Sequence, residues 1–149
     1  MKKFFTITLL VLATLVSLYT KAQPMVSKTA FDNQAILTQA DSIRTVYEMQ
    51  GFELSKASGM NMESATEVPV ILQLKAGTNY RIVFIGENSS KSCEISMFDW
   101  NEKQVVSKKQ MANVVSYDYT STATEYHMVK PVQTNKKKEV GGYFMIFKK

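Results

Sequence analysis

Residues 68–85 read VPVILQLKAGTNYRIVFI, and this stretch decides the fold class of the chain. In its first part, apolar residues recur at every second position, which is the period of a strand with one buried face. They are Val68, Val70, Leu72 and Leu74. Residues 76–78, AGT, are typical of a turn, and the YRIVFI run that follows is rich in β-branched and aromatic side chains. The stretch predicts two consecutive strands joined by a turn.

Similar runs occupy much of the remaining chain. They are residues 93–99, 104–107, 114–119, 126–132 and 143–147. The polar residues 55–66, SKASGMNMESAT, are interpreted as a loop. About seven or eight short strands, with no helical pattern between them, are typical of an antiparallel structure. We expect a mainly β fold, a jelly-roll-like antiparallel β-sandwich.

One helical pattern precedes the strands. Its apolar positions recur at spacings of three and four residues, which places them on one face of a helix. They are Ile36, Ala40, Ile43 and Tyr47. Asp32 is a suitable N-cap and Gly51 a suitable end. We therefore predict one amphipathic helix over about residues 32–50. Its apolar stripe would contact water unless it packed on an open end or face of the sandwich.

The chain begins MKKFFTITLLVLATLVSLYTKAQP, a basic start followed by an apolar run and then by small residues. This is the pattern of a secretory signal peptide, and the run is shorter than the roughly 20 residues that cross a bilayer. We predict a signal peptide over residues 1–22, an extended tether over 23–30 and a single domain over 31–149. The protein would then be exported to the periplasm or the extracellular space of a Gram-negative type bacterium, with no integral membrane segment after cleavage.

The charge balance does not indicate a nucleic-acid partner. The formal net charge is +5, but Lys2, Lys3 and Lys21 belong to the predicted signal peptide. Much of the excess is therefore a targeting feature, and the predicted mature chain is close to balance.

Residues that carry familiar chemistry are scarce. One cysteine, Cys93, cannot form an internal disulfide, and burial as a small apolar residue is expected for it. One cysteine and one histidine, His127, cannot supply a closed zinc site. We expect no catalytic residues, no metal and no cofactor. A small secreted hydrolase that uses His127, including a Cys93–His127 dyad, is the alternative.

The run CEISMFDWNEKQ, residues 93–104, holds the most concentrated candidate chemistry. Its alternation predicts that Cys93, Ile95 and Met97 face the core. In residues 99–102, the Asp and Asn side chains are interpreted as turn residues that form hydrogen bonds with nearby backbone groups. Weak cation binding by this turn is the alternative.

Aromatic side chains are the more useful lead to a binding site. Trp100 lies in the turn after residues 93–99, and Tyr117 and Tyr119 share one face of a strand. Exposed rings on a sheet can stack against a sugar or a peptide. Trp100, Tyr117 and Tyr119 are therefore the candidate ligand-binding residues, and packing in the core is the alternative interpretation.

The segments LQLKAGTNYRIVFIGE (residues 72–87) and CEISMFDWNEKQVVSKK (93–109) resemble bacterial pre-peptidase C-terminal (PPC-like) β-sandwich domains. The resemblance covers about residues 67–147 and lies in a strand, a glycine turn, a Tyr-led strand and an alternating strand that ends in Asp. Matching positions are Gly77, Tyr80, Ile95, Met97 and Asp99. It implies a non-catalytic accessory module of an exported protein. The chain lacks the acidic cluster that would support transfer of the calcium site found in some of these domains.

These observations favour an exported, non-catalytic binding or interaction module. Its partner is unknown, and a glycan, a peptide and an envelope protein all stay open. Besides the hydrolase, a subunit of an envelope assembly whose sheet edges are completed by a partner is a further alternative.

Overall fold

The computed structural model describes residues 32–149, so the predicted signal peptide and tether lie outside the described residues. In this part of the chain, one helix precedes eight strands. They are α2 (Gln34–Met49), β1 (Glu53–Glu63), β2 (Val70–Leu74), β3 (Asn79–Gly86), β4 (Ser92–Phe98), β5 (Gln104–Gln110), β6 (Val114–Thr120), β7 (Glu125–Thr134) and β8 (Glu139–Lys148). None of the helical segments from residue 32 onward is both long and apolar enough to cross a membrane.

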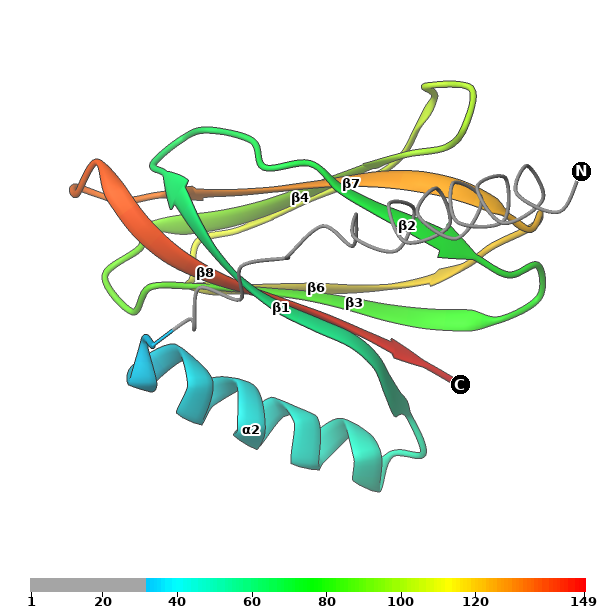
Figure 1. Ribbon diagram of the computed structural model, residues 1–149, viewed down its shortest axis with the longest axis horizontal. Helices are drawn as coiled ribbons and strands as arrows, with labels where there is room; N and C mark the ends of the chain where they lie inside the picture. The colour runs from blue at the N-terminus through cyan, green and yellow to red at the C-terminus, as the bar shows by residue number, and fades with distance from the viewer. Residues whose placement is uncertain (1–31) are drawn as a thin grey trace, which may run out of the picture. The chain divides into compact units, whose positions relative to one another are not determined.

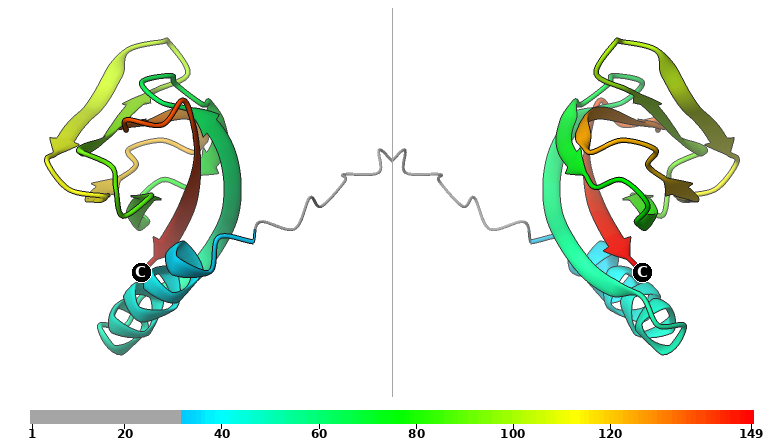
Figure 2. Two further views of the ribbon diagram at one scale, coloured as in Figure 1. Left: turned by 90° about the vertical axis from the view of Figure 1, so that its left-hand side faces the viewer. Right: turned by 90° about the vertical axis from the view of Figure 1, so that its right-hand side faces the viewer.

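The strands form two four-stranded sheets, in the orders β1-β8-β3-β6 and β2-β7-β4-β5. We call them the first and the second sheet. Neighbouring strands are antiparallel in both. Figure 1 shows the two sheets as stacked layers, and Figure 2 shows the same layers from either side. The prediction of a mainly β, antiparallel sandwich with one N-terminal helix is confirmed.

The main core lies between the two sheets. Cys93, Ile95 and Met97 of β4 are fully buried in it, as their alternation predicts. Opposite them, Phe84 of β3 packs against Gly142 of β8, where an added Cβ would lie 2.7 Å from the Phe84 ring. Gly142 therefore allows a large ring to fill the interior close to the backbone.

Helix α2 covers the outer face of the first sheet, on the side away from the second sheet (Figure 1). Its buried residues Ile36 and Ala40 join a second apolar cluster. The strand residues of that cluster that point out of the sandwich are Val83, Ile85, Met145 and Phe147. The predicted stripe and its docking on a sheet face are confirmed.

The two ends of α2 differ in how well the sequence predicts them. At the N-terminus, Asn33 rather than Asp32 is the cap, because its Oδ1 accepts a hydrogen bond from the Ile36 N–H at 3.3 Å. Both residue types are good caps, and only the position of the first turn decides between them. At the C-terminus, Gly51 has a φ of +83°, the left-handed conformation that ends many helices.

Residues 55–66 are not the predicted loop, because β1 extends from Glu53 to Glu63. The strand pairs along its length with β8, from Glu53 opposite Lys148 to Glu63 opposite Glu139. This pairing satisfies the backbone of a segment whose mostly polar side chains give no strand period. It also begins β8 at Glu139, earlier than residue 143, so that the glycines 141 and 142 lie within the strand.

Candidate functional site

The turn that follows β4 is a rigid support for an exposed tryptophan. The Oδ1 atom of Asp99 accepts hydrogen bonds from the backbone N–H groups of Asn101 and Lys103, both at 2.9 Å. The Asp99 N–H donates across the turn to the Lys103 carbonyl at 2.9 Å. Glu102 has a φ of +61°, a conformation that side chains other than glycine adopt rarely. These contacts fix the backbone on both sides of Trp100 and agree with the predicted turn chemistry.

Trp100 projects into solvent and meets a second aromatic ring. Its residue surface is 70% exposed, and its ring centroid lies 6.1 Å from that of Tyr126, at an interplanar angle of 48°. Tyr126, on β7, is 47% exposed. The two rings are therefore in contact with each other and still present surface to water.

Two apolar side chains of the second sheet extend this surface. Ile71 of β2 lies directly opposite Met128 of β7 in the strand register, and Gln73 lies opposite Tyr126. Ile71 is 55% exposed. We call the set of Ile71, Trp100, Tyr126 and Met128 the aromatic patch.

The aromatic patch borders a shallow depression of about 270 Å³. Asp99 and Glu102 line the same depression, together with part of His127. The surface thus combines two aromatic rings with carboxylate oxygens at its edge. This is a suitable composition for binding a small ligand by stacking and hydrogen bonding.

The three candidate binding residues predicted from the sequence do not form one site. Tyr117 is 8% exposed and lies in the core between the sheets, where its hydroxyl contacts the Met97 sulfur at 3.4 Å. Burial raises its pKa far above the ordinary tyrosine value. Tyr119 shares the same inward face and is partly buried. Tyr117 and Tyr119 have the packing role that was the alternative interpretation, whereas Trp100 is exposed.

Tyr119 contacts His127 beneath the aromatic patch. The Oη atom of Tyr119 and the Nε2 atom of His127 lie 3.2 Å apart, and the two rings meet edge to face at 5.4 Å. Burial raises the pKa of Tyr119, and the negative charges of Glu125 and Asp99 raise it further. The negative charges of Glu125 and Asp99 therefore act on the Tyr119 hydroxyl, which lies below the patch.

His127 is enclosed in the sandwich rather than placed at the strand surface. It is 1% exposed, its Nε2 atom lies 3.6 Å from Glu125 Oε1, and its Nδ1 atom has no hydrogen-bond partner. The imidazole is therefore part of the interior. The reason is that β7 turns the face of His127 and Val129 inward and the face of Tyr126 and Met128 outward.

Cys93 and His127 do not form a dyad. Cys93 lies opposite Gln133, near the end of β7, whereas His127 lies near its beginning. Burial raises the pKa of Cys93 to about 11, so its thiol is protonated at neutral pH. The register of β4 and β7 thus removes the alternative that depended on this pair.

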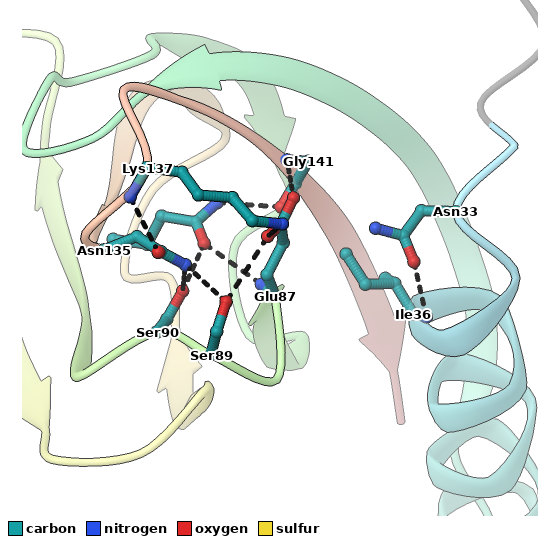
Figure 3. A network of polar contacts seen from close by, with 9 residues as sticks. Asn33, Ile36, Glu87, Ser89, Ser90, Asn135, Lys137 and Gly141 are labelled. Carbon is teal, nitrogen blue, oxygen red and sulfur yellow. Dashed lines mark hydrogen bonds and ion pairs between the residues drawn. The ribbon is translucent and has the colours of Figure 1, made fainter.

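The loop before β4 and the loop before β8 form a second polar region, shown in Figure 3. Buried Gln133 accepts from the Glu87 N–H at 3.0 Å and from the Ser90 hydroxyl at 2.6 Å, and it donates to the Gly141 carbonyl at 2.8 Å. Burial opposes ionisation of Glu87, but the Gly141 N–H and the Lys137 ammonium hold its pKa below the ordinary value. These contacts fasten the loops to the sheets.

A larger cleft of about 640 Å³ lies beside this network and is lined in part by Glu63, Glu87 and Glu139. These three carboxylates are not grouped so that they could hold a metal ion together, and no other such group of three His, Cys, Asp or Glu side chains occurs within residues 32–149. We therefore assign no cation to the cleft.

Sequence reasoning missed Tyr126 and Ile71, although the sequence carries a signal for both. If Leu72 and Leu74 face the core, the period of two places Ile71 on the opposite face. The same period separates Tyr126 from Val129. The period thus predicts that both side chains face out of the sandwich, but nothing in the sequence places these two residues beside Trp100.

Comparisons with known proteins support the fold and do not identify a family. No protein-family model matches the chain, and no curated protein matches it. Among solved structures, the chain is similar to PliG of Aeromonas hydrophila, a periplasmic lysozyme inhibitor of g-type lysozyme. The TM-score is 0.50 at 9% identity, over 67% of this chain and 90% of that chain. A CBM4 structure gives a TM-score of 0.43 at 10% identity, over 66% of this chain and 79% of that chain. The PPC-like family stays a prediction from the sequence.

Proposed function

We propose that the protein is an exported, non-catalytic binding module that holds a glycan on the aromatic patch. The observation that carries the proposal is the pair formed by Trp100 and Tyr126, two contacting rings that remain 70% and 47% exposed. A sugar ring has apolar C–H faces that stack on aromatic side chains, and hydroxyl groups that donate hydrogen bonds to carboxylates. The patch offers both kinds of partner in one place.

The rigidity of the support favours binding over a purely incidental exposure. The Asp99 carboxylate fixes the turn through two backbone hydrogen bonds, so little conformational entropy remains to be lost at Trp100 when a ligand binds. Tyr126 lies on a strand that is paired on both sides, with β2 and with β4. A site on such elements is pre-organised.

Export is part of this proposal. It rests on the signal-peptide pattern of residues 1–22. The periplasmic location of PliG is that protein's own property, and it suggests the same compartment here. Size-resolved detection of the cleaved chain in the periplasm and in the culture medium of the expressing bacterium tests both cleavage and destination.

A protein partner in the cell envelope is the second candidate. The likeness to a lysozyme inhibitor favours it, since that fold neighbour acts on a protein. A stable protein interface buries roughly 800 Å² on each partner, so a protein partner would have to contact residues well beyond the depression. A hydrolase that uses His127 has less support, because the imidazole is enclosed and its polar neighbours are Tyr119 and Glu125.

The test is a glycan-array screen of the chain over residues 23–149, followed by titration of the best oligosaccharide. Trp100→Ala should weaken binding by about 30-fold, the effect of losing roughly 2 kcal/mol at an aromatic anchor. Met111→Ala is the matched control, because Met111 is 79% exposed and lies outside the patch. Equal affinity of the Trp100→Ala variant and the wild type would contradict the proposed site.

A further inference from the structure

We propose that the aromatic patch selects glycans that carry a free amino group, so that the ligand is a cationic amino sugar rather than a neutral or N-acetylated one. This inference rests on the proposed function and adds the charge of the ligand to it. It follows from the carboxylates that border the patch and from the positions of the nearby lysines.

The depression beside Trp100 is lined by acidic and apolar groups. Asp99 and Glu102 contribute two carboxylates, and no lysine or arginine lies among the lining residues. Glu125 is a third, partly exposed carboxylate, and its Oε1 atom lies 3.6 Å from Nε2 of the buried His127. A neutral ligand would leave this negative charge uncompensated, whereas an ammonium group would compensate it.

Two lysines adjoin the patch, Lys130 on β7 and Lys103 in the turn, and neither forms an ion pair with Asp99 or Glu102. Lys130 forms an ion pair with Glu67 at 2.9 Å, and its ammonium lies 5.0 Å from the centre of the Phe98 ring. Lys103 follows Glu102 in the chain, and no ion pair joins the two side chains. The carboxylates of Asp99 and Glu102 therefore form no ion pair with any residue from 32 onward.

The two carboxylates differ in what they can give to a ligand. Asp99 uses its Oδ1 atom to hold the turn, through the N–H groups of Asn101 and Lys103. The Glu102 carboxylate makes no hydrogen bond within the described chain, and its backbone is fixed at a φ of +61°. Glu102 is thus the group that can accept a charge-assisted hydrogen bond from an ammonium without breaking an existing contact.

The aromatic rings favour the same charge. A cation over the face of a tryptophan or tyrosine ring is attracted by the negative face of the π-system. On the patch, an amino sugar could stack its apolar face on Trp100 and turn its ammonium toward Glu102. Both attractions require a protonated amino group on the ligand, so the comparison belongs in slightly acidic solution.

The experiment compares the glucosamine pentamer with the N-acetylglucosamine pentamer, in which acetylation removes the positive charge of each amino group and adds an acetyl group; the Glu102→Gln variant separates the effect of charge from that of the acetyl group. Binding of each to the chain over residues 23–149 is measured by titration calorimetry at about pH 6 and low salt. We expect the glucosamine pentamer to bind at least about fivefold more tightly. Glu102→Gln should remove this preference and leave the affinity for the N-acetylated pentamer unchanged. Glu63→Gln, which removes the same charge outside the patch, should preserve the preference.

The outcomes separate the two proposals. Equal affinities, or tighter binding of the N-acetylated pentamer, would overturn the charge selection; the proposed function still stands if Trp100→Ala weakens binding of both pentamers by about 30-fold. A preference that survives in Glu102→Gln would also overturn the inference. Binding of neither pentamer would overturn the inference, and a glycan array without hits would overturn the proposed function as well.

Discussion

The two outer faces of the sandwich carry similar kinds of residue and have opposite environments. On the first sheet, Val83, Ile85 and Phe147 point outward and are fully buried, because α2 lies over them. On the second sheet, Ile71 and Tyr126 also point outward and are 55% and 47% exposed. An outward apolar side chain in a β-sandwich is therefore not by itself a sign of a binding surface. Whether another element covers the face decides its role.

The same contrast holds for the cations on each face. Arg81 on the first sheet lies 4.6 Å from the Tyr47 ring centre and 4.3 Å from that of Phe52, and it pairs with Asp118 through two hydrogen bonds. Lys130 on the second sheet lies over a single ring and forms one ion pair. On the covered face, Arg81 joins the sheet to Tyr47 of α2 and to Phe52. On the open face, Lys130 neutralises the charge of Glu67 and, within residues 32–149, joins no further element to the sheet.

The largest expected effect separates the two faces by a matched truncation. Ile36→Ala removes a residue that is 1% exposed between α2 and the first sheet, and should lower the free energy of unfolding by about 3 kcal/mol. Ile71→Ala on the open face should lower it by less than about 1 kcal/mol. Urea denaturation of both variants measures the difference. Equal losses would mean that the open face is buried in solution by a partner or a second copy.

A smaller effect is expected for the two cations. Arg81→Ala should cost about 1.5 kcal/mol, because the guanidinium loses two aromatic contacts and a bidentate carboxylate pair. Lys130→Ala should cost about 0.5 kcal/mol, the usual size for an exposed ion pair. Thermal unfolding of the two variants side by side checks the order. A larger loss for Lys130→Ala would contradict the assignment of roles to the two faces.

The smallest expected effect is a loss of stability in acid, caused by protonation of Asp118 in its pair with Arg81 on the covered face. The hydrogen bonds and the positive charge of Arg81 lower the pKa of Asp118, despite partial burial. A carboxyl group whose pKa is lowered by folding stabilises the protein above its ordinary pKa, near 3.8. That contribution disappears as the pH falls through the lowered value.

The measurement is the stability difference between wild type and Asp118→Asn at about pH 7 and about pH 2.5. The difference should be below about 1 kcal/mol at neutral pH, because the Asp118 side chain is 45% exposed, and should become smaller in acid. In the Arg81→Ala background, the pH dependence of the Asp118→Asn effect should be reduced, with a remainder from the charge of Lys108. A constant difference across the pH range would show that the pair contributes by packing alone.

Much of the fold follows from local patterns in the sequence. The alternation of Leu72 with Leu74 and of Ile95 with Met97 predicts which strand faces are buried, because the period of a strand fixes the direction of each side chain. The stripe from Ile36 to Ala40 predicts the buried face of α2 for the same reason, with the period of a helix. The turn at Asp99 and the burial of Cys93 also follow from local patterns, whereas the sequence leaves open whether Trp100 is exposed.

Only the tertiary structure decides which face of each sheet meets another element. The polar strand β1 exists because β8 pairs with it, and the neighbours of Trp100 are set by the register of β2 and β7. Tyr117 and Tyr119 were predicted to share a face, and the stacking of the sheets turns that face inward. The physical reason is that periodicity records the two sides of a single element, whereas burial and the composition of a site depend on contacts between elements that are distant in the chain.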